Sequence, residues 1–352
     1  MNIKITGSGS YIPTERVSNL DFAKHSFLNE DGSQFPHPNE VVAQKFLEIT
    51  GIEERRYVTD DLTASDIAAI AAQRAIEDAK IDPETLDYII LAHNFGDVKK
   101  GAIQSDILPS LASRVKYTLK IKNPKCVAYD ILFGCPGWIE GVIQAQAYIK
   151  AGMAKKCLVI GAETLSRVVD MHDRDSMIYS DGAGATIVEA TQEEGGVLAN
   201  ESATFAYDEA YYLYFGNSFD KNSDPDVRYI KMYGRKIYEF ALSNVPKAMA
   251  ACLDKSGVDI SKVKKVLIHQ ANEKMDEAIV QRFFRLYKQT PPDGVMPMSI
   301  HKLGNSSVAT VPTLYDLLIK GEVENQELNK GDVLLFASVG AGMNINAFVY
   351  QM

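Results

Sequence analysis

The feature that most constrains the fold is a repeat, because the second half of the chain follows the strand pattern of the first. Three pairs of segments match: 86–93 with 263–270, 155–163 with 331–339, and 182–189 with 340–350. In each half an apolar strand precedes the strand associated with Gly-Ala-Gly, and helices are expected between them. Continuous apolar strands are typical of sheets that are covered on both faces. The repeat therefore predicts a pseudo-twofold α/β protein in which helices sandwich the sheets.

The remaining segments predict further elements of the same α/β type. Residues 3–11 have the pattern of a strand, and helices are expected over 41–49, 63–80 and 104–120. The chain has 352 residues, 46% of them hydrophobic, which is enough for one large core or two fused ones.

Composition and charge exclude several classes of protein. The net charge of −9 argues against a general nucleic-acid binder, which is usually basic. The four cysteines form no CxxC pair, so neither zinc nor disulfides are expected. Residues 1–7 resemble a short strand rather than a signal peptide, and no apolar run approaches the length of a membrane span. We expect a soluble, cytoplasmic protein without a metal site or a membrane association.

A strand-to-helix elbow carries the first candidate for chemistry. Cys126 to Leu132 has the composition of a buried strand, and Pro136 suits the first turn of a helix that runs to Lys150. Cys135 is therefore expected at the N-cap, where cysteine pKa values fall to roughly 3.5–7.5. The alternative interpretation is a small buried apolar residue, since free cysteine is commonly buried.

Two further candidates follow predicted secondary structure in the second half. His269 lies at the carboxyl end of the strand VLIHQ, and Asn305 lies in a glycine turn, Gly304-Asn-Ser-Ser, that opens a helix. Open α/β sheets place their sites at the carboxyl ends of strands. A hydrogen-bonded core histidine and a turn or capping asparagine are the alternative interpretations.

Taken together, these motifs resemble the β-ketoacyl-[acyl-carrier-protein] synthase III family of the thiolase superfamily. The elbow at Cys135, His269-Gln-Ala-Asn272, Gly304-Asn-Ser-Ser and Gly340-Ala-Gly342 occur in the family's order and approximate spacing. Thr50-Gly-Ile-Glu-Glu-Arg and the segment 173–185 also resemble their counterparts, so that the resemblance covers nearly the whole chain.

The resemblance implies a fold, an assembly and a reaction. The fold is a five-layered αβαβα arrangement of two duplicated halves, residues 1–190 with the nucleophilic cysteine and residues 191–352 with the histidine and asparagine. The assembly is a homodimer. The reaction is decarboxylative condensation: the Cys135 thiolate takes an acyl group from a thioester, while His269 and Asn305 donate hydrogen bonds to a malonyl thioester. Backbone N–H groups of Cys135, Ala341 and Gly342 are the expected oxyanion hole. No cofactor is implied.

The positions implied for substrate binding are Arg174, Gly234, Arg235, Asn272 and Leu108, and several of them depart from the family. Lys45 and Ile49 stand where the family has a tryptophan and an arginine that hold coenzyme A, and Arg235 stands where it has an asparagine. Arg174 keeps the position that packs on the adenine. Leu108 aligns with the partner-subunit phenylalanine that limits the acyl pocket, so a longer chain is admissible. The donor is therefore either a coenzyme-A or a carrier-protein thioester.

An acyl carrier protein is acidic, and an acidic enzyme needs a basic face to bind it. Lys274, Arg282 and Arg285 follow the HQAN motif at near-helical spacing, while Ile279, Phe283 and Leu286 are expected to face inward. Lys231, Arg235 and Lys236 are expected to extend this basic face. An ordinary solvated helix face is the alternative interpretation.

Three other functions compete with this one. A ketosynthase of secondary metabolism, joining longer or β-keto acyl chains toward a dialkylresorcinol-type product, fits the altered coenzyme-A positions. A Cys-His-Asn thioester hydrolase shares the residue types and their order, but leaves the duplicated halves unexplained. A non-catalytic carrier-binding relative has no need of all three residues.

Overall fold

The computed structural model describes residues 2–352. The strands are β1 Asn2–Tyr11, β2 Glu15–Ser18, β3 Glu54–Tyr57, β4 Tyr88–His93, β5 Val127–Leu132, β6 Lys156–Thr164, β7 Asp181–Thr191, β8 Gly196–Thr204, β9 Leu213–Gly216, β10 Tyr229–Met232, β11 Val263–Ile268, β12 Val333–Gly340 and β13 Asn344–Gln351. The helices are α1 Asn39–Thr50, α2 Ala64–Ala79, α3 Leu111–Thr118, α4 Gly137–Lys150, α5 Gly234–Ser256, α6 Glu273–Leu286, α7 Ile300–Leu303 and α8 Thr310–Ile319.

Two larger sheets repeat one topology. The first has the order β1-β7-β6-β4-β5 and the second has the order β8-β13-β12-β11. In both sheets the first two neighbouring pairs are antiparallel and the third pair is parallel. β4 thus corresponds to β11, β6 to β12 and β7 to β13, which are the pairs that the sequence repeat predicts. Strand β5 has no counterpart in the second sheet.

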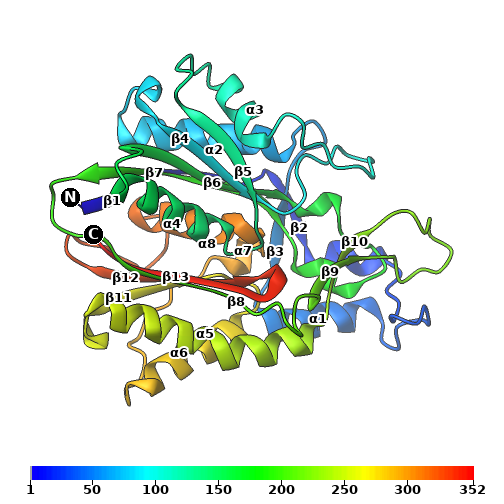
Figure 1. The fold of residues 1–352 in the computed structure, drawn as a ribbon. Coiled ribbons are helices and arrows are strands. Elements are labelled where there is room, and N and C mark those ends of the chain that lie inside the picture. The colour runs from blue at the N-terminus through cyan, green and yellow to red at the C-terminus, as the bar shows by residue number, and fades with distance from the viewer. Residues whose placement is uncertain (1) are drawn as a thin grey trace.

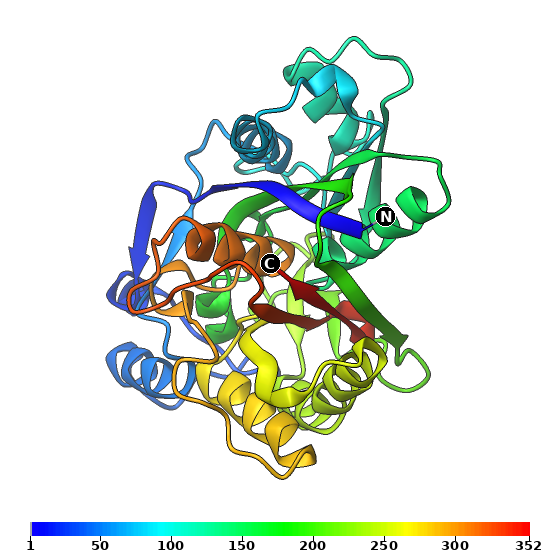
Figure 2. The same cartoon turned by 90° about the vertical axis from the view of Figure 1, so that its left-hand side faces the viewer.

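Helices form three layers around these sheets (Figures 1 and 2). Helices α2 and α3 pack on the outer face of the first sheet, and α5 and α6 pack on the outer face of the second. Helices α4 and α8 lie between the sheets, in a core that also holds Ile3 and Ile5 from one sheet and Phe336 and Phe348 from the other. The five-layered αβαβα fold with duplicated halves is therefore confirmed.

The two sheets also divide the chain near its middle. The first sheet takes all its strands from residues 2–191, and the second takes its strands from residues 196–351. The halves 1–190 and 191–352 stay a prediction, and their boundary falls one residue before the end of β7 at Thr191. Within residues 2–352, none of the helices combines the length and the apolar character needed to cross a membrane.

Two local predictions were wrong. The helix expected over 104–120 begins only at Leu111, because Pro109 cannot donate a backbone N–H and Ser110 caps the helix by accepting the Ser113 N–H at 3.3 Å. The strand after Cys126 is not buried, because β5 forms the edge of its sheet. Val127 and Leu132 are 47% and 68% exposed. An apolar composition indicates a strand, but it does not tell a central strand from an edge that another chain can cover.

Candidate active site

The nucleophile candidate lies between the end of β5 and the start of α4. The turn closes with a hydrogen bond from the Gly137 N–H to the Gly134 carbonyl at 2.7 Å, and Pro136 occupies the N-cap position. Cys135 therefore precedes the N-cap by one residue, rather than occupying it as expected. The cysteine lines a cavity of about 730 Å³.

The expected lowering of the Cys135 pKa is not found. Burial raises the pKa of this thiol to about 11, and the nearby Glu163 carboxylate also raises it, while a hydrogen bond from Ser307 acts in the opposite direction. The prediction relied on the helix N-terminus alone and could not include the loss of solvent around the sulfur. At neutral pH the resting side chain is the thiol.

His269 follows the last residue of β11 and lines the same cavity. Its backbone N–H donates to the Ala337 carbonyl of β12 at 2.9 Å, which fixes the residue at the end of the sheet. Burial lowers the imidazole pKa to about 4, so the ring is neutral at pH 7. Its Nδ1 atom is buried without a partner among residues 2–352, which leaves Nε2 to act in the cavity.

Asn305 reaches the cavity from the turn that precedes α8. Its backbone is held by the segment just before β7: the Asn305 N–H donates to the Ile178 carbonyl at 3.0 Å, and the Asn305 carbonyl accepts the Ser180 N–H at 2.9 Å. The side-chain Oδ1 accepts the Ser307 N–H at 2.8 Å. Since the oxygen is occupied in this way, the Nδ2 amide is the part that remains to donate to a substrate.

The glycine turn after β12 packs directly on the elbow. A Cβ atom at Gly340 would lie 2.5 Å from the backbone nitrogen of Cys135, and one at Gly134 would lie 2.7 Å from the nitrogen of Ala341. Only glycine permits this approach. Gly342, at φ 76, completes the turn but does not line the cavity. Backbone N–H groups of the two segments are thus brought together, as the proposed oxyanion hole requires.

Four of the substrate-binding candidates line the cavity: Arg174, Gly234, Arg235 and Asn272. Asn272 also caps α6, because its Oδ1 accepts the Met275 N–H at 3.0 Å. Arg235 is exposed and pairs with Glu239 at 2.9 Å. Leu108 lies outside the cavity and is 87% exposed, so it touches no substrate bound within this subunit.

Phe35 lines the cavity beside a substrate-binding candidate, and no sequence pattern predicted it. Phe35 comes from a polar loop, and its ring centre lies 4.8 Å from the guanidinium carbon of Arg174. Lys45 and Ile49 line the cavity nearby. Phe35 is the aromatic residue of the loop 26–40 that lines this cavity beside Arg174, but nothing in the sequence connected it to the arginine.

The basic residues on and near α6 divide into two groups. Lys274, Arg282 and Arg285 are exposed, and the Arg282 guanidinium donates to the Leu242 carbonyl of α5 at 3.0 Å. Lys231 does not extend this surface, because it is buried against Asp170 and Asp173 at 2.6 and 3.0 Å. Leu286 is likewise exposed rather than inward-facing, while Phe284 is buried in its place.

Trp138 follows the nucleophile candidate by three residues but does not line the cavity. The indole is buried between the sheets, donates to the Thr186 hydroxyl at 3.2 Å and packs on Phe336 and Phe348. Trp138 therefore contributes to the central layer rather than to the cavity.

Among residues 2–352, no cluster of three or more His, Cys, Asp or Glu side chains is arranged to hold a metal ion.

Comparisons with known proteins identify relatives of this chain. The family model of 3-oxoacyl-[acyl-carrier-protein (ACP)] synthase III matches residues 129–204, and that of its C terminal matches residues 253–352. The chain is 30% identical to β-ketoacyl-[acyl-carrier-protein] synthase III of Staphylococcus haemolyticus (strain JCSC1435) over 352 residues, covering 100% of this chain and 99% of that protein.

Two further comparisons cover nearly the full length. The chain is 31% identical to the enzyme of the same name from Neisseria gonorrhoeae (strain NCCP11945), over 99% of this chain and 98% of that protein. The crystal structure of 3-oxoacyl-[acyl-carrier-protein] synthase III from Aquifex aeolicus VF5 superposes with a TM-score of 0.82 at 29% identity, covering 99% of this chain and 100% of that one. On these full-length matches, the chain belongs to the β-ketoacyl-[acyl-carrier-protein] synthase III family.

Proposed function

We propose that this protein is an acyltransferase that condenses a cysteine-bound acyl group with a malonyl thioester and releases CO2. The observation that carries the proposal is the convergence of Cys135, His269 and Asn305 on one cavity, beside the backbone turn at Gly340. A thiol, two neutral hydrogen-bond donors and an oxyanion site are the groups that this reaction needs.

In the first half-reaction the Cys135 sulfur attacks the carbonyl carbon of an acyl thioester. The C–S bond to the donor breaks, the acyl group stays on Cys135, and the thiol proton leaves with the donor as its free thiol. The tetrahedral oxyanion is held by backbone N–H groups of Cys135 and the Ala341 turn, where one donor is typically worth about 3–4 kcal/mol. Because the resting group is a thiol, ionisation of Cys135 is part of the barrier to acylation.

In the second half-reaction a malonyl thioester occupies the cavity. Its carboxylate leaves as CO2, and the electron pair forms an enolate whose oxygen accepts hydrogen bonds from His269 Nε2 and Asn305 Nδ2. The enolate carbon then attacks the acyl carbonyl, the bond to Cys135 breaks, and the sulfur takes up a proton. A neutral imidazole suits this role because it donates without protonating the enolate carbon, and burial keeps His269 neutral.

The arrangement of Asn305 supports condensation over hydrolysis. In a Cys-His-Asn hydrolase the third residue orients the histidine through its ring nitrogen. Here the Asn305 Oδ1 accepts the Ser307 N–H, and His269 Nδ1 has no partner among residues 2–352. The Asn305 side chain therefore does not orient His269, and its amide can donate to a substrate in the cavity.

The proposed donor is an acyl carrier protein and the proposed enzyme is a homodimer that works in the cytoplasm. Two observations support the carrier protein. The Phe35 ring lies 4.8 Å from the guanidinium carbon of Arg174, and so covers one face of the residue that is expected to pack on the adenine of coenzyme A. The side chains of Lys274 and Arg285 are exposed on α6, where an acidic carrier protein could contact them. The exposed apolar edge of β5 supports the dimer, in which Leu108 would complete the acyl pocket of the partner subunit. A ketosynthase that joins longer or β-keto chains uses the same steps and differs only in the acyl groups.

The test is the mass of the acylated protein. Incubation with a panel of acyl-carrier and acyl-coenzyme-A thioesters should add one acyl group to the peptide that contains Cys135, and malonyl thioester should remove it as a 3-oxoacyl product. The identity of the product distinguishes a priming enzyme from one that joins two β-keto chains.

Variants of two cysteines provide the controls. Cys135→Ala should abolish the adduct and all product, whereas Cys252→Ala should leave both intact, because Cys252 is a buried thiol in the core of the second half. A stoichiometric adduct on any cysteine other than Cys135 would contradict the proposal, and so would release of free acid in place of condensation product.

A further inference from the structure

A serine contacts the nucleophile directly. The Ser307 hydroxyl donates a hydrogen bond to the Cys135 sulfur at 3.4 Å, and both residues line the cavity. Ser307 has a φ of 53, in the left-handed region that non-glycine residues avoid. Such conformations are energetically unfavourable and concentrate at functional sites. A strained serine that touches the reacting atom suggests a role in the chemistry.

The direction of this hydrogen bond is set by an asparagine. Asn94 follows β4, and its Nδ2 amide donates to the Ser307 hydroxyl oxygen at 3.1 Å. The oxygen therefore acts as the acceptor toward Asn94, and the serine proton remains free to point at the sulfur. A hydroxyl that donates to sulfur favours the thiolate over the thiol.

A buried carboxylate holds the asparagine in turn. The Glu163 side chain, 1% exposed in β6, accepts the Asn94 backbone N–H at 2.6 Å and a second hydrogen bond from the Asn94 side-chain amide. With one amide hydrogen on Glu163 and the other on Ser307, the orientation of Asn94 is fully determined. The three side chains form a directed series of hydrogen bonds that ends at Cys135.

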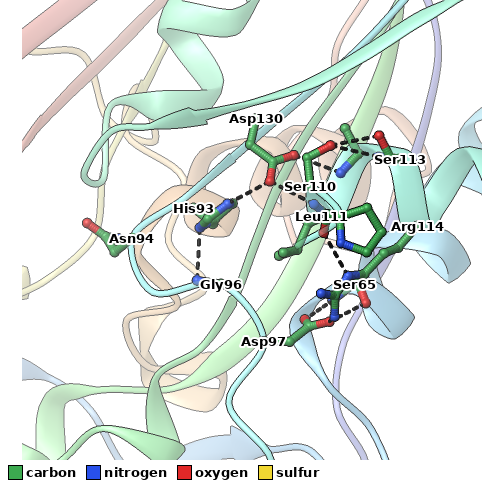
Figure 3. A network of polar contacts seen from close by, with 12 residues as sticks. Ser65, His93, Asn94, Gly96, Asp97, Ser110, Leu111, Ser113, Arg114 and Asp130 are labelled. Carbon is green, nitrogen blue, oxygen red and sulfur yellow. Dashed lines mark hydrogen bonds and ion pairs between the residues drawn. The ribbon is translucent and has the colours of Figure 1, made fainter. Parts of the chain in front are cut away.

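The neighbouring residues make this support rigid (Figure 3). His93 precedes Asn94, accepts the Gly96 N–H at its Nδ1 at 2.9 Å, and meets Asp130 through Nε2 at 3.1 Å. Asp130 also accepts the Leu111 N–H at 2.7 Å, so β4, β5 and α3 all fix the start of this loop. On the other side, Val308 lies so close to Gly161 of β6 that a Cβ there would be 2.4 Å from the Val308 carbonyl oxygen.

We propose that Ser307 is a further catalytic residue, which stabilises the Cys135 thiolate during acylation, and that Asn94 and Glu163 are positioning residues that aim its hydroxyl. The inference rests on the proposed function in that Cys135 is taken as the nucleophile. It adds three residues to the site, two of which line the cavity and one of which lies behind it.

Glu163 has a second, opposite effect, and this makes the proposal testable. Burial raises the pKa of this carboxyl to about 7, so that above pH 7 it carries a charge, which disfavours the thiolate. Replacing Glu163 by Gln removes the charge but keeps an oxygen that accepts from Asn94. A purely structural role predicts no gain from this change, whereas loss of the charge with the hydrogen bonds to Asn94 kept predicts a more acidic Cys135.

The experiment measures the rate at which iodoacetamide alkylates Cys135 between pH 6 and 12, a range that contains the Cys135 pKa of about 11, with the melting temperature of each variant. Ser307→Gly should slow alkylation at pH 8 by about tenfold, the size of one lost charge-assisted hydrogen bond, and move the pH midpoint upward. Its melting temperature should not fall, because glycine accepts the left-handed conformation. Glu163→Gln should accelerate alkylation at pH 8 and lower the midpoint.

A matched control removes a hydroxyl outside the series. Thr310→Val deletes a buried hydroxyl that has no partner among residues 2–352, and it should alkylate at the wild-type rate. Asn94→Ala should slow alkylation, but the double variant Asn94→Ala/Ser307→Gly should be no slower than Ser307→Gly alone, because Asn94 acts through the serine. Additive losses, or a wild-type rate in Ser307→Gly, would overturn the proposal.

Alkylation also separates this inference from the proposed function. If Cys135 takes no acyl group from any thioester while the variants shift its alkylation as described, the reaction is wrong and the hydrogen-bonded series stands. If acyl transfer proceeds in the wild type but Ser307→Gly and Glu163→Gln leave the alkylation profile unmoved, the reaction stands and the series is wrong.

Discussion

At the scale of single residues, the site depends on neutral rather than charged side chains. Burial lowers the His269 pKa to about 4 and raises the Cys135 pKa to about 11, so both are uncharged at pH 7. Neither His269 nor Asn305 shares a hydrogen bond with Cys135 among residues 2–352. This separation suggests that the cysteine serves acylation and that the other two residues serve the malonyl thioester.

The separation can be tested by substituting each donor. His269→Ala and Asn305→Ala should still form acyl-Cys135, but should lose decarboxylation, with a condensation barrier higher by about 3 kcal/mol for each missing donor. Mass analysis reports acylation and release of labelled CO2 reports decarboxylation. His301→Ala is the control histidine, since His301 lies outside the cavity lining and pairs with Glu273 at 2.9 Å. Variants that decarboxylate normally but fail to acylate would reverse the roles.

At the scale of elements, α6 combines the cavity wall with a candidate docking surface. Its first turn is capped by Asn272, which lines the cavity, and its exposed side presents Lys274 and Arg285. Arg282 has a second role, because its guanidinium donates to the Leu242 carbonyl at 3.0 Å. Charge reversal there would also remove a hydrogen bond between α5 and α6, worth about 1 kcal/mol of stability. Lys274 and Arg285 are therefore the cleaner positions for testing docking.

The double variant Lys274→Glu/Arg285→Glu should reduce kcat/KM for an acyl-carrier donor about tenfold or more at low salt and flatten its salt dependence, because exposed charges act on association. A small thioester donor should be used at the wild-type rate. Lys264→Glu, at the opposite end of β11 from His269, should affect neither donor. Equal losses with both donors would mean that α6 supports the fold rather than the carrier.

At the scale of the whole molecule, the edge of the first sheet at β5 is the surface where we expect a second chain to pair. Strand β5 is half-exposed along its length, Leu132 is 68% exposed, and Leu108 lies in the loop before α3 at 87% exposure. Exposed apolar edge strands are otherwise protected in native proteins. The nucleophile follows β5 directly, so pairing at this edge would also hold the elbow in place.

The corresponding prediction concerns assembly. Val127→Glu/Leu132→Glu should shift the protein from dimer to monomer in light scattering, because two like charges per chain would meet at the interface. Condensation activity should fall with the dimer fraction. Leu198→Glu places a charge on β8, the edge of the other sheet, where Leu198 is 37% exposed, and should leave assembly unchanged. A wild type that is monomeric while fully active would refute the dimer.

The strand repeat was sufficient to predict two related α/β halves, because the order of apolar strands can be read directly from the sequence, whereas the five-layered arrangement was implied by the family resemblance. The matching of β4 with β11, β6 with β12 and β7 with β13 could be predicted in this way. So could the candidates Cys135, His269 and Asn305, since each follows a recognisable strand or glycine turn. Their convergence on one cavity is a result of the fold.

Only the tertiary structure decided properties that depend on neighbours from distant parts of the chain. Desolvation by both halves raises the Cys135 pKa, against the prediction from the helix N-terminus. Phe35 meets Arg174 across 139 positions (174 − 35), and Asn94 meets Ser307 across 213. No local pattern encodes such contacts, because side-chain pairing and the loss of solvent are set by packing between segments that the linear sequence leaves far apart.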